Sequence, residues 1–387
     1  MGKILIFKMK NFCYASSFYF ADRVAECFDN LGWDVEIFDL LRDGKGQLQK
    51  YCGQKFDAIL DFNSQLPKLL TDDGEIFLNT IEGPFYNYIL DHPLYHHEML
   101  TQKVKNYHVI CVDDNHRRYI ERWYPNIQSA HVLPVAGSTA DVILPMEQRP
   151  IDVLFTGTYT NPEDMYRLML KMGGNRSDEL QAMLERQMAN QNLPLETVFE
   201  KFLSEIGRSA EEVDFPLRMW SYFPIDTYAT ASFRERVVKT IAEGGIRINI
   251  AGHGWDKCKE LSGLSNVTFM GPVDFHRQFE LMAQAKIVLN VMPGFKAGIH
   301  DRVFSAMCNG AVCLSDSSEM LAEEFEDGTD LITFSGDSLY ELPELIKKWT
   351  GDVEGLNNIA IHGRNKCEKN HTWMAHCSLM KKIFEKN

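Results

Sequence analysis

The sequence predicts an α/β protein of two domains, each built on a parallel sheet with helices between its strands. The chain has 387 residues, which is longer than a domain with a single hydrophobic core usually is, and 45% of the residues are hydrophobic. Two series of short apolar runs alternate with amphipathic stretches, and a Pro-containing segment at 142–150 separates the two series. Near-continuous apolar runs are typical of strands buried on both faces of a parallel sheet.

The first series opens as a strand-helix-strand unit, and we assign it to a first domain at residues 1–150. Strands are predicted at 3–8, 34–40, 56–62, 75–80, 107–112 and 132–135, with an amphipathic helix at 16–31. No G-x-G-x-x-G follows the first strand, which disfavours a dinucleotide-binding dehydrogenase.

The second series begins at Ile151 and predicts a second domain at 151–366. Its first strand ends in Thr156-Gly157-Thr158, and a later strand ends in Gly252-His253-Gly254-Trp255. Glycines in such turns let backbone approach a ligand. A helical insertion at roughly 161–236 lies between these two strands, and we expect it to cover the site or to join subunits.

Residues 285–316 form the most informative part of the second domain. A predicted strand ends at Pro293-Gly294, Gly298-Ile299-His300-Asp301-Arg302 leads into a helix, and another strand follows at 311–314. Ligands of open α/β sheets bind at the carboxyl ends of the strands, and free N–H groups at a helix start favour phosphate. Because Arg302 opposes the helix macrodipole there, a bound anion explains its position better than a structural role does.

This stretch resembles the CgeB-like, group 1 family of glycosyltransferases. The shared pattern consists of Leu289-Asn290, Pro293, Gly298, His300, Arg302-Val303-Phe304, Ala306-Met307, Gly310-Ala311 and Ser315-Asp316. One position departs, because relatives usually have a Glu that holds the donor ribose where this chain has Ser305. The resemblance implies the GT-B fold, in which two Rossmann-like domains face a cleft and a C-terminal helix, here at 367–387, packs back on the first domain.

The resemblance also implies an activity. It is that of a hexosyl- or N-acetylhexosaminyl-transferase, which moves a sugar from a UDP- or GDP-sugar to an acceptor hydroxyl of a glycan, protein or small molecule. Such enzymes need no tightly bound cofactor and no catalytic metal. The expected donor site consists of Thr156, Gly157, Thr158, Gly252, His253, Gly254, Trp255, Asn290, Pro293, Gly298, His300, Asp301, Arg302, Val303 and Ser305.

Within this set Arg302 is also expected to act in catalysis, by stabilising the leaving diphosphate. The alternative function is a catalytically inactive GT-B protein that binds a sugar or a nucleotide. The main support for this alternative is Ser305 in place of the usual Glu.

The candidate acceptor-side residues are Asp91 and His92, which follow a predicted strand end. Either side chain can take the proton of an acceptor hydroxyl, and the D-H-P triplet resembles an Asp-x-Pro element of the family. In the alternative interpretation Asp91 only caps a helix that begins at Pro93. Asp113 is a further option of the same kind, most simply an N-cap. A metal site on His92 and His96 would need ligands that the sequence does not identify.

Composition bounds the partners and the compartment. A formal charge of −14 and a pI near 5.4 argue against a broad nucleic-acid interface. No apolar run reaches 18 residues, and the start lacks the pattern of a signal peptide. Nine cysteines, mostly inside predicted strands and helices, indicate reduced thiols of a cytoplasmic protein. The expected partners are the nucleotide-sugar donor, the acceptor and, through the helical insertion, a second copy of the chain.

Overall fold

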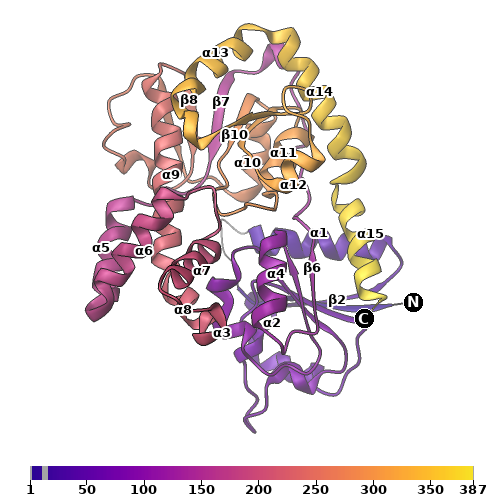
Figure 1. The fold of residues 1–387 in the computed structure, drawn as a ribbon. Coiled ribbons are helices and arrows are strands. Elements are labelled where there is room, and N and C mark those ends of the chain that lie inside the picture. Colours follow the sequence, from indigo (N-terminus) through magenta and orange to yellow (C-terminus); the bar gives the residue numbers. More distant parts are fainter. Residues whose placement is uncertain (1, 11–15, 387) are drawn as a thin grey trace. The chain divides into compact units, whose positions relative to one another are not determined.

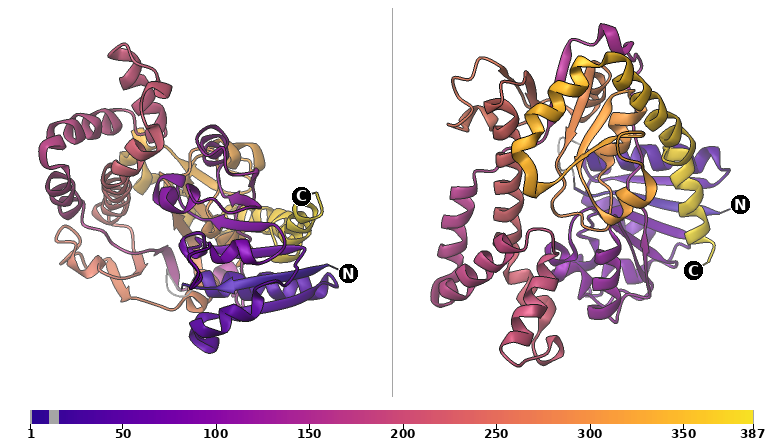
Figure 2. Two further views of the ribbon diagram at one scale, coloured as in Figure 1. Left: turned by 90° about the horizontal axis from the view of Figure 1, so that it is seen from below. Right: turned by 45° about the horizontal axis from the view of Figure 1, so that its top comes forward.

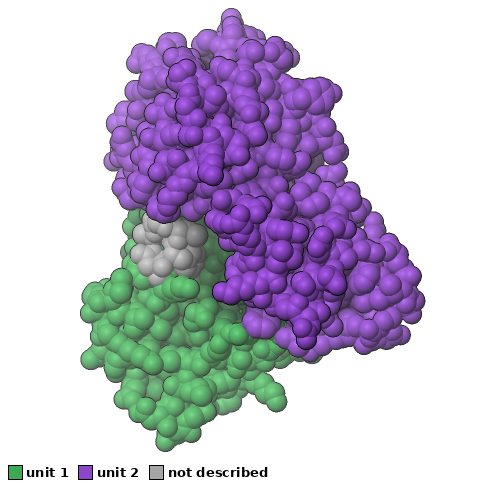
Figure 3. All heavy atoms as spheres, turned by 90° about the vertical axis from the view of Figure 1, so that its left-hand side faces the viewer, with its two compact units in different colours: residues 1–136, 370–387 green, residues 137–369 purple. Residues whose placement is uncertain are grey.

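A computed structural model describes residues 2–10 and 16–386, which divide into two compact units. Unit 1 comprises residues 1–136 and 370–387, and unit 2 comprises residues 137–369 (Figure 3). Each unit has its own six-stranded parallel sheet flanked by helices (Figure 1), so the predicted two-sheet α/β fold is confirmed. Within the described ranges no helix is both long and apolar enough to cross a membrane.

The sheet of unit 1 has the strand order β2-β1-β3-β4-β5-β6. Its strands are β1 (Lys3–Lys8), β2 (Asp34–Asp39), β3 (Ala58–Phe62), β4 (Phe85–Ile89), β5 (Tyr107–Cys111) and β6 (Ser129–Val132). Its α-helices are α1 (Ser16–Asn30), α2 (Leu40–Asp43), α3 (His97–Leu100), α4 (Asp114–Trp123) and α15 (Trp373–Phe384). Short 3-10 helices are η1 (Lys45–Tyr51), η2 (Leu66–Lys68), η3 (Phe77–Thr80) and η4 (Pro93–His96). Because every pair is parallel, all carboxyl ends lie on one edge.

Helix α1 shows how the sequence builds this unit. Phe20, Val24 and Phe28 recur every fourth residue, so they share one helix face, and all three are buried. The C-terminal helix α15 packs on α1 through aromatic rings, with centroids 5.5 Å apart for Phe28 and Phe384 and 5.6 Å apart for Phe20 and Trp373. The end of the chain is therefore part of the core of unit 1.

Two strand predictions in unit 1 are wrong. The expected strand at 75–80 contains the 3-10 helix η3, and the sheet instead uses β4, whose residues FYNYI are all buried. The Asn87 in that segment interrupts an apolar pattern, but its amide is satisfied inside the fold by Tyr107 and Ser64. The last strand lies at Ser129–Val132 and not at 132–135, because Pro134 lacks the N–H that a ladder needs.

The sheet of unit 2 has the order β12-β11-β10-β7-β8-β9. Its strands are β7 (Ile151–Thr156), β8 (Ile248–Ala251), β9 (Val267–Gly271), β10 (Ala285–Asn290), β11 (Val312–Asp316) and β12 (Ile332–Phe334). Its α-helices are α5 (Pro162–Gly173), α6 (Ser177–Ala189), α7 (Leu195–Glu205), α8 (Phe215–Ser221), α9 (Phe223–Glu243), α10 (Phe275–Met282), α11 (Asp301–Cys308), α12 (Glu319–Glu324), α13 (Leu342–Gly351) and α14 (Val353–Asn370). Helices α5, α6 and α9 pack together as the helical insertion between β7 and β8 (Figure 2).

The structure differs from the expected boundaries of the second domain at two places. Residues 137–150, expected in the first domain, belong to unit 2 because buried polar groups hold them there. Arg149 is 4% exposed and donates to the carbonyls of Ala285 (2.7 Å) and Asn309 (2.9 Å). The insertion, expected to end near residue 236, continues to Glu243, and Val237 and Ile241 near the end of α9 join the core of the sheet.

Candidate functional site

The candidate site of unit 2 lies at the carboxyl edge of its sheet. Strand β10 pairs with β7 on one side and β11 on the other, which places Thr156, Asn290 and Asp316 near the ends of neighbouring strands. These polar side chains are buried, with exposed fractions of 0%, 0% and 8%. Buried polar groups need hydrogen-bond partners, so we identified the partners of these three side chains.

Arg302 is the partner of two of these residues. Its Nε donates to Thr156 Oγ1 (2.9 Å) and its Nη1 to Asn290 Oδ1 (2.9 Å). The Asn290 amide in turn donates to Ser315 Oγ (2.8 Å), which fixes the orientation of its oxygen. Both acceptors are neutral, and among the described residues Arg302 forms no ion pair with a carboxylate. Burial lowers the pKa of Arg302 from its usual value, against the attraction of Asp301 and Asp316.

Helix α11 begins beside this guanidinium. His300 is its N-cap, and His300 Nδ1 accepts a hydrogen bond from Arg302 N (3.2 Å) while lying 2.8 Å from Asp301 Oδ1. A neutral ring can accept from the amide, whereas a protonated ring would donate to Asp301 instead. Burial opposes ionisation of Asp301, but His300 and Arg302 outweigh it and lower the pKa of Asp301.

Arg234 of α9 is a second cation at this edge, and the sequence interpretation missed it. Burial lowers the pKa of Arg234 to about 10, and the positive charge of Arg302 adds to the effect. Within the described chain Arg234 makes no hydrogen bond and no ion pair. Its position inside a long helical insertion gave no motif by which to find it. The only sequence signal was an Arg at the boundary between the insertion and the sheet layer.

Asp316 is a buried carboxylate at the same edge. Its Oδ1 accepts a hydrogen bond from Met292 N (2.8 Å). Burial raises the pKa of Asp316 to about 6, although the Met292 amide and the charges of Lys296 and Arg234 oppose the rise. Three cations, Arg302, Arg234 and Lys296, therefore face two carboxylates, Asp301 and the partly protonated Asp316, so this edge carries excess positive charge inside an acidic protein.

The predicted glycine turns lie against each other at the ends of β7 and β8. Gly157 N donates to Ala251 O (3.0 Å), and Gly157 has a φ of 155° that favours glycine. A Cβ on Gly252 would lie 1.9 Å from Gly157 O, so only glycine fits there. Gly254 has the left-handed φ of 87°, and the exposed His253 lies between these two glycines. The glycines thus serve close packing of two loops beside Arg302.

Three of the expected donor-site residues are buried in other roles, which corrects the sequence-based site. Trp255 is 1% exposed, and its Nε1 donates to Gly157 O (2.8 Å), so its ring belongs to the core. Ser305 is 1% exposed, and its Oγ accepts from Ser138 N (3.1 Å), which leaves no access for a ribose. The side chain of Val303 is fully buried, and its N–H donates to His300 O (3.0 Å).

Of the remaining predicted residues, Gly298 is buried and its carbonyl accepts a hydrogen bond from Ser318 Oγ (2.6 Å). Pro293 is half-buried in the loop that follows β10. Both therefore shape the loop that leads to His300 and Arg302.

In unit 1, Asp91 follows β4 at the carboxyl edge and is exposed. Its Oδ2 accepts a hydrogen bond from Asn63 Nδ2 (2.9 Å). His92 is the N-cap of η4, so the interpretation of Asp91 as the cap is wrong. His92 Nδ1 accepts from Leu94 N (3.0 Å), which puts the proton of a neutral ring on Nε2. This tautomer argues against His92 as a base. Asp113 is the N-cap of α4, as its simplest interpretation predicts.

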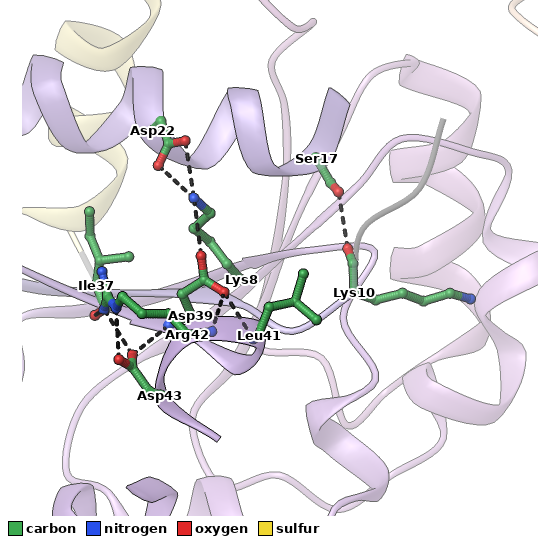
Figure 4. A network of polar contacts seen from close by, with 9 residues as sticks. All are labelled: Lys8, Lys10, Ser17, Asp22, Ile37, Asp39, Leu41, Arg42 and Asp43. Carbon is green, nitrogen blue, oxygen red and sulfur yellow. Dashed lines mark hydrogen bonds and ion pairs between the residues drawn. The ribbon is translucent and has the colours of Figure 1, made fainter. Parts of the chain in front are cut away.

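The neighbouring strand ends of unit 1 balance their charges internally (Figure 4). Lys8 of β1 donates to both carboxylate oxygens of Asp22 (2.9 and 3.0 Å) and lies 3.5 Å from Asp39 of β2. Asp39 in turn caps α2. This cation is already neutralised by the fold. In the described part of the chain no group of three His, Cys, Asp or Glu side chains is arranged to hold a metal ion.

Comparisons with known proteins agree with this architecture. Residues 234–381 match the family model described as glycosyl transferase-like. The structure is similar to Anabaena Alr3699/HepE, solved in complex with UDP-glucose, with a TM-score of 0.57 at 10% identity, covering 100% of both chains. It is also similar to sucrose-phosphate synthase from Thermosynechococcus elongatus, with a TM-score of 0.55 at 10% identity, covering 100% of this chain and 99% of that one. No curated protein sequence shows significant similarity to the chain.

The fold is therefore that of the GT-B glycosyltransferases, as predicted. A third similar structure, AviGT4, is a glycosyltransferase involved in avilamycin A biosynthesis, with a TM-score of 0.53 at 10% identity, covering 100% of this chain and 98% of that one. Fold and family-model match together support a group 1 glycosyltransferase. The narrower CgeB-like assignment stays a prediction.

Proposed function

We propose that this glycosyltransferase uses a UDP- or GDP-sugar and binds the donor diphosphate in unit 2 through Arg302, Arg234 and Lys296. The observation that carries the proposal is Arg302, a half-buried guanidinium held by two neutral oxygens. A desolvated cation without a carboxylate partner gains most from an incoming anion. The complex of HepE with UDP-glucose, in a protein of the same fold, supports a UDP-sugar as the first donor to test.

The chemistry is a transfer at the anomeric carbon of the donor. The bond from that carbon to the diphosphate oxygen breaks, the nucleoside diphosphate leaves with the electron pair, and the acceptor oxygen bonds to the carbon. Arg302 and Arg234 stabilise the charge that grows on the leaving group. The acceptor hydroxyl gives its proton to a base, for which we propose Asp91 of unit 1. Since side-chain cations can neutralise the diphosphate, we expect transfer to proceed without a divalent metal.

The test is release of nucleoside diphosphate from UDP-glucose, UDP-N-acetylglucosamine and GDP-mannose, with and without EDTA. The proposal expects release from at least one donor, faster with the acceptor present and unaffected by EDTA. Titration calorimetry with UDP and GDP should show binding to the same protein. Binding without release from any donor would support the alternative of an inactive, nucleotide-binding GT-B protein. Absence of binding would contradict both.

The proposal also includes a contact between two copies of the chain and a cellular compartment. Exposed apolar side chains on the helical insertion, Met172 (51%), Ile206 (53%) and Leu217 (45%), favour it as a contact between two copies of the chain. Light scattering on the purified protein tests this contact. All eight described cysteines are free thiols, and seven of them are buried, which supports a reducing, cytoplasmic compartment. The ninth, Cys13, lies outside the described residues.

A further inference from the structure

Asn290, the last residue of β10, is a buried amide with a partner at each end. It is 0% exposed, its Oδ1 accepts from Arg302 Nη1 (2.9 Å), and its Nδ2 donates to Ser315 Oγ (2.8 Å). Asn290 and Ser315 are direct neighbours in the register of β10 and β11, so the sheet itself places the two side chains together. Because the amide is shielded from water, it depends on these two partners.

The two partners accept only one orientation of this amide. The Ser315 hydroxyl donates to Asp316 O (2.8 Å), so its proton is already committed and its oxygen can only accept from Asn290. A guanidinium has donors and no acceptor. Both partners therefore require the amide oxygen to face Arg302 and the amide nitrogen to face Ser315.

Asn290 holds Arg302 without adding a negative charge. Thr156 Oγ1, which accepts from Arg302 Nε (2.9 Å), is neutral as well. An aspartate has nearly the same size as an asparagine, but at position 290 its carboxylate would form an ion pair with the guanidinium. The asparagine therefore supplies the geometry of such a pair and leaves the charge of Arg302 for another partner.

The guanidinium held in this way directs its remaining donors to the turn after β7. Nη2 of Arg302 makes no hydrogen bond to a described residue, and it lies 4.0 Å from where a Cβ at position 157 would be. This position is Gly157, whose φ of 155° favours glycine. No side chain at this position therefore competes with an anion for Nη2.

We infer that Asn290 is a positioning residue, which holds Arg302 by a neutral oxygen and so keeps its charge and its Nη2 available to the donor diphosphate. The inference rests on the proposed function and involves unit 2 alone. Because both ends of its amide are used inside the fold, Asn290 acts through Arg302 and not by its own contact with the donor. Position 290 therefore requires an acceptor that is uncharged.

The test is titration calorimetry of the full chain with UDP. Asn290→Ala leaves Arg302 charged but removes the oxygen that holds it, so UDP binding should weaken about three- to tenfold. Asn290→Asp keeps an acceptor at the same place but adds a negative charge at the diphosphate site, so UDP binding should weaken roughly ten- to hundredfold. Melting temperatures should rank the other way, because alanine leaves a cavity and unpaired polar groups whereas aspartate pairs with Arg302.

The matched control is Asn266→Asp, which adds the same charge directly before β9, at the amino edge of the same sheet. Asn266 donates to two backbone carbonyls, those of Ala242 and Ile246, and its replacement should leave the UDP affinity unchanged. Wild-type UDP affinity in either Asn290 variant, or equal losses in Asn266→Asp and Asn290→Asp, would overturn the inference. A lower affinity in Asn290→Ala than in Asn290→Asp would overturn it too, because it would assign Asn290 to the scaffold alone. A wild-type protein that bound neither UDP nor GDP would instead contradict the proposed function.

Discussion

The carboxyl edges of the two sheets treat charge in opposite ways. In unit 1 the partly buried cation Lys8 is paired with Asp22 and Asp39, so the fold itself supplies its counter-charge. In unit 2, Arg302 is held by neutral oxygens, and Arg234 has no polar partner in the described chain. Desolvating a charge is unfavourable unless it is compensated. The fold itself compensates the first edge, whereas at the second edge the proposed donor diphosphate would supply the counter-charge.

The contrast also shows why overall composition does not locate a site. The chain carries a formal charge of −14, yet unit 2 concentrates positive charge at one strand edge. The acidic excess lies on solvated surfaces, where water compensates each charge separately. The sign of a local field is set by the few groups that water cannot reach.

Of the substitutions that test this difference between the two edges, replacement of Arg302 should have the largest effect. We expect Arg302→Ala to weaken UDP binding roughly ten- to hundredfold, because a charge-assisted contact contributes about 1.5–3 kcal/mol. Arg302→Lys should restore only part of the affinity, since a point charge cannot replace the planar fork that also meets Thr156 and Asn290. Calorimetric titration measures both variants.

The matched control for Arg302 is Arg247→Ala. Arg247 is a cation of the same unit that pairs with Asp152 near the start of β7, at the opposite edge of the sheet. Arg247→Ala changes the net charge by the same amount as Arg302→Ala and should leave the UDP affinity unchanged. Equal losses in the two variants would mean that only net charge matters, and an unaltered Arg302→Ala would move the donor site away from this loop.

In unit 1 the buried Asp61 carboxyl group retains a proton at neutral pH. Desolvation raises the pKa of Asp61 to about 8, against hydrogen bonds from Ser64 and Phe62, whereas the unfolded carboxyl titrates near 3.8. The folded state therefore keeps a proton that the unfolded chain releases, and stability falls as pH rises from 6 to 8. One pH unit corresponds to ~1.4 kcal/mol per proton, so the loss should be about 2 kcal/mol.

Asp61→Asn removes this titration, and its side-chain amide can still accept the hydrogen bond that the Ser64 hydroxyl donates to Asp61. Its free energy of unfolding should change less between pH 6 and 8 than that of the wild type, as urea titrations at the two pH values can show. The same pH dependence in both proteins would mean that Asp61 is ionised in the folded protein. The two sheet edges would then differ less in how completely their charges are compensated.

The sequence predicted most of the fold because its strongest signals were local. Mostly apolar runs such as 107–112 and 151–156 identify parallel strands, and the pattern from Leu289 to Asp316 identified the edge that carries Arg302. The strand β4 was missed because a buried Asn87 makes its segment look less apolar than its environment is. Buried amides satisfied by distant partners cannot be seen in a single-sequence pattern.

The site was predicted only in part for the same reason. The motif gave Arg302 and Asn290, which are close in sequence, but not Arg234, which the fold brings from the end of a long insertion. Trp255 and Ser305 were expected in the donor site from their places along the sequence, yet both side chains are buried. A sequence motif fixes where a residue lies along a helix or strand, whereas its burial depends on which residues pack against it. Here Gly157 contacts Trp255, and Ser138 contacts Ser305.

A smaller effect is expected at Arg234. Arg234→Met should weaken UDP binding about three- to tenfold, because a second cation adds to the field at the diphosphate without being its main anchor. The free protein should be as stable as the wild type or slightly more stable, since Arg234 forms no polar contact in the described chain and repels Arg302. Calorimetry and thermal melts measure the two properties. Lower stability with unchanged affinity would assign Arg234 to the scaffold.

The smallest expected effect belongs to Lys8, the counterpart of Arg234 in unit 1. Lys8→Met makes the same charge change, but it removes a cation whose side chain is 11% exposed and already paired with Asp22 and Asp39. We expect a loss of about 0.5–1 kcal/mol of stability, as for other partly exposed ion pairs, and no change in UDP affinity. The two methionine variants therefore predict opposite outcomes from one kind of substitution. A loss of UDP affinity in Lys8→Met would show that an internally paired cation can also serve a ligand, and charge balance would then no longer distinguish the two edges.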